Sequence, residues 1–176
     1  RPCRDRGGSR RRGCCGRAIR ALATLLPATK LHGTDIDSEA IEWLRHNYAS
    51  KGEFTVAPSL PPAPYRDAMF DFVFGISVFT HLPEDMQFAW LAELARILKP
   101  GAYAVLTTHG AGFHNSLDAK AAEQLKERGF YYGQFGSNYG RSISLPDFYQ
   151  TAFHSHDYIR SRWNEFLEVL AIEPLG

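Results

Sequence analysis

The chain has 176 residues, of which 44% are hydrophobic and 22% are charged, and its formal net charge is +1. This length suits one domain with a real core and is short for two, so we expect a single domain over residues 13–176. No apolar run approaches the roughly 20 residues of a membrane span and no signal-peptide pattern follows the N-terminus, which predicts a soluble, cytoplasmic protein without a membrane partner.

The small net charge hides an asymmetry between the start of the chain and the rest. Residues 1–20 hold eight Arg and one Asp (+7), which leaves 12 basic and 18 acidic residues (−6) in the remainder. An Arg cluster can bind nucleic acid, but the acidic remainder would repel phosphate, so we expect no nucleic-acid partner. The other interpretation is that residues 1–12 are an irregular basic segment that replaces a buried hydrophobic strand.

The first predicted element is a glycine turn over residues 13–17 that opens a helix over 18–26. Cys14 and Cys15 within the turn, like Cys3, have no zinc or redox spacing, and we expect no metal site. The next run, 30–37, reads as a strand that ends in Asp35. Asp37 or Ser38 then caps a helix that ends near residue 51.

Residues 53–56 form a short candidate strand, and a proline-rich loop over 57–64 follows it. The continuous apolar run 69–76 is typical of a central parallel strand. A helix from Pro83 to Leu98 and a strand over 102–108 come next.

After His109 we expect residues 110–150 to form a lid or substrate-binding insertion. It includes a polar helix over 119–128 and a run rich in glycine and aromatic residues over 129–140, suited to a hairpin. A strand over 149–153, a helix that Ser155 caps and a last strand over 166–172 complete the pattern. This alternation predicts a Rossmann-like, doubly wound α/β fold, with a mostly parallel sheet and helices on both faces.

Four stretches together resemble the class I S-adenosylmethionine-dependent methyltransferases of the small-molecule type. They are Gly-Cys-Cys-Gly-Arg at 13–17, Gly-Thr-Asp-Ile-Asp at 33–37, Phe-Asp-Phe-Val-Phe-Gly-Ile-Ser-Val-Phe-Thr-His-Leu at 70–82 and Leu-Lys-Pro-Gly at 98–101. The resemblance implies S-adenosyl-L-methionine as cofactor. It also implies cofactor-binding roles for five residues: Gly13 and Gly16 in the turn, Asp35 at the ribose, Ile36 beside the adenine, and Ser77.

The chain departs from this family at both ends, because the first strand is degenerate and a last antiparallel strand is missing. A truncated fragment with a shifted reading frame at its start would explain both departures, as a hypothesis. The resemblance covers residues 13–110 closely and the remainder more loosely.

Methyl transfer depends mainly on orientation, and a general base helps when the acceptor is a poorly ionised hydroxyl or amine. The candidates are His81, His109 and His114, which follow the carboxyl ends of strands, where ligands of open α/β sheets bind. Each could instead be a structural histidine that hydrogen-bonds to the backbone. We expect a small-molecule acceptor that bears a hydroxyl or carboxyl group, and the sequence indicates no oligomeric state.

Two alternatives to a methyltransferase remain open from the sequence. A nicotinamide-dependent oxidoreductase shares the glycine turn and the ribose acid, but the G-x-G-x-x-G motif is absent. A non-catalytic or defective methyltransferase-like fragment would keep the outline of the fold without the cofactor.

Overall fold

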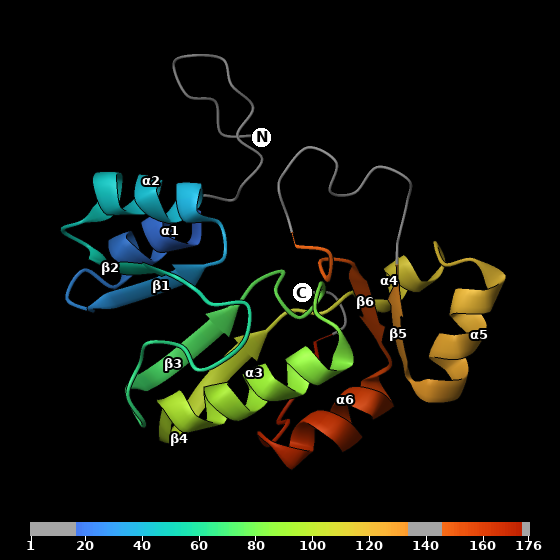
Figure 1. Cartoon of the computed structure of the whole chain (residues 1–176). Helices are drawn as coiled ribbons and strands as arrows, with labels where there is room; N and C mark the ends of the chain where they lie inside the picture. The colour runs from blue at the N-terminus through green and yellow to red at the C-terminus, as the bar shows by residue number, and fades with distance from the viewer. Residues whose placement is uncertain (1–16, 134–145, 174–176) are drawn as a thin grey trace. The chain divides into compact units, whose positions relative to one another are not determined.

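The computed structural model describes residues 17–133 and 146–173 (Figure 1). The chain divides into two compact units, residues 1–59 and residues 60–176. The prediction of one domain over residues 13–176 stays a prediction, and the basic segment 1–12 lies outside the described residues. No helix in the described part of the chain is long and apolar enough to cross a membrane.

The first unit is a two-stranded parallel sheet with two helices. Its elements are α1 (Arg17–Leu25), β1 (Leu31–Asp35), α2 (Ser38–Tyr48) and β2 (Gly52–Val56). β1 and β2 pair in register from Leu31 opposite Gly52 to Asp35 opposite Val56. A side chain at position 52 would place its Cβ 2.3 Å from the carbonyl oxygen of Leu31, so the strand pair requires glycine there.

Five buried apolar side chains form the core of this unit: Ile19, Leu31, Ile41, Leu44 and Phe54. They come from both helices and both strands. Figure 1 shows α1 and α2 beside the β1–β2 pair, which fits the predicted amphipathic spacing of both helices.

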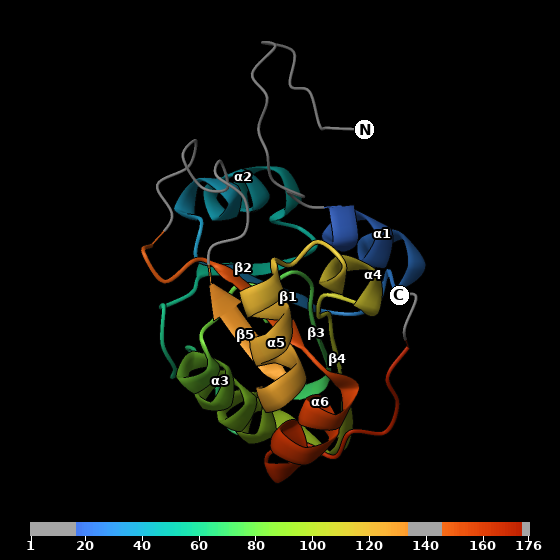
Figure 2. The ribbon, with the colours of Figure 1, turned by 90° about the vertical axis from the view of Figure 1, so that its right-hand side faces the viewer.

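The second unit contains two further strand pairs. Its elements are β3 (Phe70–Gly75), α3 (Glu84–Ile97), β4 (Leu98–Leu106), α4 (Ala111–His114), α5 (Ala119–Arg128), β5 (Phe130–Gly133), β6 (Thr151–His154), α6 (His156–Arg162) and the 3-10 helix η1 (Trp163–Glu165). β3 and β4 are parallel, whereas β5 and β6 are antiparallel. Figure 2 shows α5 in front of β5, and these two elements are in contact.

The core of the second unit gathers apolar side chains from α3, β5, β6, α6, η1 and the segment after β3. Its buried members are Phe79, Leu91, Leu94, Ile97, Phe130, Ala152, Tyr158, Ile159 and Trp163. A partly buried ionic network also ties the proline-rich loop to α3. Glu93 accepts the N–H of Ala63 at 2.8 Å, and Arg96 bonds both Glu93 at 2.6 Å and the carbonyl of Tyr65 at 2.8 Å.

The α/β alternation predicted from the sequence is confirmed. The hairpin predicted within residues 129–140 stays a prediction, because residues 134–140 lie outside the described residues; the described strand β5 pairs with β6. The strand predicted over 166–172 is wrong. The N–H groups of Phe166 and Leu167 both bond the carbonyl of Trp163, and irregular chain follows to residue 173. The apolar residues of this run pack against the core of the unit instead of pairing in a sheet, and a short apolar run cannot distinguish these two outcomes.

Candidate functional site

The carboxyl end of β1 presents two aspartates with different tasks. Asp37 is the N-cap of α2, since its Oδ1 accepts the N–H groups of Glu39 at 2.9 Å and Ala40 at 3.1 Å. Asp35 is exposed, and its Oδ1 accepts the N–H of Asp37 at 3.0 Å, a bond that orients the carboxylate at the strand tip. The sequence left the cap open between Asp37 and Ser38, and the structure assigns it to Asp37.

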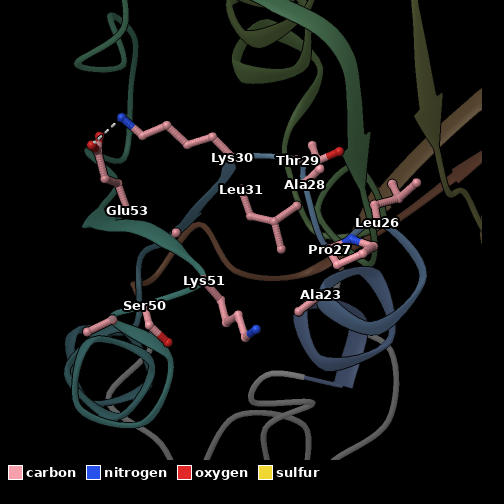
Figure 3. A pocket seen from close by; sticks show the side chains of 12 residues that line it. Ala23, Leu26, Pro27, Ala28, Thr29, Lys30, Leu31, Ser50, Lys51 and Glu53 are labelled. Atoms are coloured by element: carbon pink, nitrogen blue, oxygen red, sulfur yellow. Dashed lines mark ion pairs between the residues drawn. The ribbon is translucent and has the colours of Figure 1, made fainter.

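A pocket of about 380 Å³ lies at the opposite end of the same strand pair (Figure 3). Its lining includes Leu31 and Gly52, the first residues of β1 and β2, and Lys30 and Glu53 form an ion pair of 2.6 Å beside them. Ligands of open α/β sheets bind at the carboxyl ends of the strands. This pocket is therefore distinct from the predicted nucleotide site at Asp35.

In the second unit, the segment after β3 has a strained backbone at Ser77. This residue is exposed and has a φ of +56°, which side chains rarely adopt outside turns and binding sites. Thr107, just after β4, holds the conformation: its Oγ1 accepts the N–H of Ser77 at 2.8 Å, and its own N–H donates to the carbonyl of Gly75 at 3.0 Å. The predicted cofactor contact thus lies on a fixed turn.

His81 is buried and anchored at the start of β6. Its Nδ1 lies 2.8 Å from the carbonyl oxygen of Gln150, and its ring stacks on Tyr149 at 4.2 Å between centroids. Burial lowers the pKa of His81, so its imidazole is neutral near pH 7.

His109 makes the equivalent bond two residues further along, from Nδ1 to the carbonyl oxygen of Ala152 at 2.9 Å. Its ring is half-buried and lies 4.9 Å from Phe153 and 5.2 Å from Phe113 between centroids. The rings of His81 and His109 are 6.3 Å apart.

His114, the last residue of α4, completes the group. Burial lowers its pKa, while a hydrogen bond to the backbone of His109 acts in the opposite direction. Its Nε2 is buried and has no hydrogen-bond partner among the described residues. The structure therefore brings together all three histidines that the sequence singled out, around β6; we call His81, His109 and His114 the histidine cluster.

The bonds to the carbonyls of Gln150, just before β6, and of Ala152, within β6, fix the tautomers of two cluster members. A backbone carbonyl can only accept a hydrogen bond, so the Nδ1 of His81 and the Nδ1 of His109 must each carry a proton. In the neutral ring the other nitrogen, Nε2, then has the lone pair. This is the form in which an imidazole can take a proton from a substrate.

Sequence reasoning missed the partners that orient this cluster. Gln150 and Ala152 contribute only backbone carbonyls, for which a residue type gives no signal. It also left the role of His154 undefined. That side chain is fully buried; its Nε2 lies 2.8 Å from Oε1 of Gln87, and burial lowers its pKa to about 3.

A family model described as "Methyltransferase domain" matches residues 12–106, which is more than half of the chain. The chain belongs to this family. The match decides against the nicotinamide-dependent oxidoreductase. It confirms an S-adenosylmethionine-dependent methyltransferase with a Rossmann-like α/β fold, and S-adenosylmethionine as its cofactor.

Solved structures of methyltransferases are similar to this one. An S-adenosylmethionine-dependent methyltransferase from Methanosarcina mazei is 25% identical, with a TM-score of 0.59 over 84% of this chain and 73% of that chain. A methyltransferase from Haloferax volcanii, in complex with the Trm112 methyltransferase activator, is 23% identical, with a TM-score of 0.47 over 86% and 74%. PKMT2 from Rickettsia typhi, in complex with AdoHcy, is 15% identical, with a TM-score of 0.45 over 88% and 34%.

The strand tip of the first unit fits this cofactor. Asp35 offers an exposed, oriented carboxylate, which is the acceptor that a pair of ribose hydroxyls requires, and the half-buried apolar Ile36 follows it. Gly13 and Gly16 lie outside the described residues, and their predicted contacts with the cofactor stay predictions.

Proposed function

We propose that this methyltransferase acts on a small-molecule acceptor and that His109 takes the proton of the acceptor during transfer. The observation that supports this role is the bond from the Nδ1 of His109 to the carbonyl of Ala152. It orients the ring and leaves Nε2 as the basic nitrogen. Among the three candidates, His109 combines this tautomer with a half-buried ring, whereas His81 is buried.

The assignment gives His81 a positioning role. Its ring is stacked on Tyr149 and bonded to Gln150, so it holds the segment that enters β6. β6 in turn carries the carbonyl that orients His109. The N–H of Ala152 donates to the carbonyl of Thr80 at 2.8 Å. This second bond holds β6 against the segment after β3.

Asp35, Ile36 and Ser77 are the described residues that we assign to the cofactor. The bound cofactor supplies an electrophilic methyl group on a sulfonium sulfur. The chain contributes orientation at Asp35 and a proton acceptor at His109, and positioning is the larger part of catalysis in reactions of this kind.

Charge and aromatic content support a small acceptor. Residues 60–176 hold nine basic and 13 acidic side chains, which disfavours a polyanionic substrate such as nucleic acid. The predicted insertion 110–150 contributes two of the aromatic rings beside the histidine cluster, Phe113 and Tyr149. Tyr132 of β5 donates a hydrogen bond to the carbonyl of Phe148, so this aromatic surface is anchored to the hairpin.

The base is tested by His109→Asn, in which the amide nitrogen can still donate to the carbonyl of Ala152 but the basic nitrogen is lost. We expect kcat to fall about 10²- to 10⁴-fold while the affinity for S-adenosylmethionine stays the same. His46→Asn, an exposed position on α2, is the matched control. An unchanged kcat for His109→Asn would rule out the assignment.

The acceptor class is tested with S-adenosylmethionine labelled in its methyl group. The chain is incubated with three fractions of a cell extract: metabolites that pass a dialysis membrane, total RNA and total protein. We expect label in the metabolite fraction, and Asp35→Ala should abolish it. Label confined to RNA or protein would show that the acceptor is a macromolecule.

A further inference from the structure

We infer that two buried side chains, Gln87 and His154, position the segment between β3 and α3 for methyl transfer. This segment contains Ser77, the proposed cofactor contact, and His81. Gln87 is 0% exposed and His154 is 1% exposed, so both act through the segment that they hold and not by direct contact with a ligand. The inference rests on the proposed function, because that function assigns Ser77 to the cofactor, and it adds two positioning residues.

Gln87 holds the segment by its side-chain amide. It lies near the start of α3, and its Nε2 donates to the carbonyl of Phe79 at 3.1 Å and to the carbonyl of Leu82 at 2.9 Å. Thr80 and His81 lie between these two carbonyls, so the bonds fix both ends of the stretch that carries them. Both amide hydrogens are used in this way, and the amide oxygen Oε1 is left as an acceptor.

His154 fixes the orientation of that amide. Its Nε2 lies 2.8 Å from Oε1 of Gln87, and since an amide oxygen can only accept, this Nε2 must carry a proton. The rings of Phe130, Tyr158 and Trp163 enclose the imidazole, at 5.2, 5.9 and 5.4 Å between centroids. A flipped amide would set its own N–H groups against the N–H of His154 and its oxygen against two carbonyls. All three bonds therefore require one orientation.

The backbone of Ser77 needs such support. A positive φ at a residue with a side chain persists only where the surrounding structure over-determines it, and φ at Ser77 is +56°. Thr107 fixes the β3 side of the turn, because its Oγ1 accepts the N–H of Ser77 at 2.8 Å. Gln87 fixes the α3 side through the carbonyls of Phe79 and Leu82. Loss of the second support should let Ser77 leave its observed conformation.

The alternative is a pair that only fills the core. Apolar side chains would fill this space without burying polar groups, which is unfavourable unless the groups are bonded. The bonds of Gln87 and His154 instead lead to the segment that carries Ser77. They also tie β6 to this segment a second time, beside the bond from the N–H of Ala152 to the carbonyl of Thr80. This connection favours positioning over filling.

Three variants and a control separate positioning from stability. Gln87→Met keeps the volume and removes the amide, His154→Leu removes the donor to Oε1, and His154→Gln returns an N–H donor near the position of Nε2. Leu125→Ala removes a buried apolar side chain of α5, which can form no hydrogen bond with the segment, so it lowers stability alone. Gln87→Met and His154→Leu act independently, so the test holds if one of them fails to fold.

The first measurement is the three-bond coupling between the amide and α protons of Ser77, which reports φ. It is made by NMR on the full chain and needs no cofactor. We expect the coupling to change in Gln87→Met and His154→Leu, and to keep its unaltered value in His154→Gln and Leu125→Ala. An unchanged coupling in both Gln87→Met and His154→Leu, or an equal change in Leu125→Ala, would overturn the inference.

The second measurement is the Kd for S-adenosylmethionine, by calorimetry at a temperature at which each variant is folded. We expect this Kd to rise about three- to tenfold in Gln87→Met and in His154→Leu, the effect of one lost hydrogen bond at the proposed contact of Ser77. It should stay unchanged in His154→Gln and Leu125→Ala. A lower melting temperature with an unchanged Kd in both Gln87→Met and His154→Leu would show a pair that only fills the core and would refute the positioning.

This inference and the proposed function can fail separately. Label from S-adenosylmethionine in RNA or protein alone would refute the small-molecule acceptor, and the coupling and the Kd would still decide the role of the pair. Labelled metabolites together with an unchanged coupling and Kd in Gln87→Met and His154→Leu would leave the acceptor assignment intact and refute only the positioning by the pair.

Discussion

The two units of the chain place their polar side chains in different ways. The first unit has an apolar core of five side chains. Its polar groups make their bonds outside this core: Asp37 caps α2, and the exposed Lys30 forms an ion pair with Glu53. The second unit buries polar side chains, among them Gln87, Glu93 and His154. The difference fits the two tasks that we propose for them. An exposed carboxylate in the first unit would accept from the hydroxyls of the cofactor, and an imidazole in the second unit is oriented by fixed main-chain partners.

The largest expected effect is a loss of stability when a core side chain of either unit is removed. Phe54→Ala in the first unit and Leu91→Ala in the second each remove a buried side chain, at a cost of about 2–5 kcal/mol. We expect each substitution to reduce the hydrogen-exchange protection of its own unit far more than that of the other. Equal loss of protection throughout the chain would show that the two units unfold as one.

The pH dependence of stability should reside in the second unit. Because burial lowers the pKa of His154 to about 3, below its ordinary value of 6.5, the unfolded chain takes up a proton between these pH values and the folded chain does not. Stability present above pH 6.5 is therefore lost as pH falls, by about 3 kcal/mol at pH 4.5.

Urea unfolding from pH 7 to 4.5 measures this loss. The matched variant is His154→Gln, in which the side-chain amide can still donate to Gln87 but does not titrate. Its stability should vary less with pH in this range, and a slope identical to that of the unaltered chain would show that other groups cause the loss.

Cofactor affinity should depend on the rim of the first unit. Asp35→Asn keeps an oxygen that can accept from the N–H of Asp37 but loses the charge, so the bonds to the ribose hydroxyls lose about 1.5–3 kcal/mol. Calorimetry should show a Kd for S-adenosylmethionine that is about 10- to 150-fold higher. Glu42→Gln, an exposed change on α2, is the control, and unchanged affinity in Asp35→Asn would refute the ribose assignment.

The smallest expected effect is the loss of stability when the N-cap of one helix in either unit is removed. Asp37 caps α2 in the first unit, and Asp118 caps α5 in the second through the N–H of Ala121 at 2.8 Å. Each change to Ala should reduce stability by about 1 kcal/mol, because the cap bond is local and solvent-exposed. Thermal unfolding that is insensitive to either change would show that the capped helix is held by its packing alone.

Local sequence patterns predicted much of this structure. Periodicity and helix capping are properties of neighbouring residues, so they can be recognised in a single sequence. They predicted three features correctly: the strand end at Asp35, the helix that begins after Asp37 and the apolar strand over 70–75. The histidines were also found, as polar residues after strand ends. What placed them in the cluster could not be read from one sequence, because the bonds from His81 to Gln150 and from His109 to Ala152 span 69 and 43 residues.

The error over 166–172 has a related cause. The apolar residues of this segment pack against the core that contains Trp163; they are Phe166, Val169 and Ile172. An irregular segment that covers a core and an edge strand contain the same residue types, so the sequence could not distinguish them. The short helix α4 was not predicted, since four residues give no helical period. His114 therefore entered the cluster through an element that the sequence did not reveal.

The attachment of His109 to a carbonyl of β6 has a consequence for how such an enzyme can diversify. The proposed base is aligned by a main-chain atom of Ala152, which any amino acid at that position supplies, and the β5–β6 ladder fixes this atom by pairing Ala152 with Tyr132. Side chains of the β5–β6 pair can then change during evolution while the main-chain bond to His109 stays in place. Descendants of this chain could acquire new acceptors in this way while inheriting the same orientation of the imidazole.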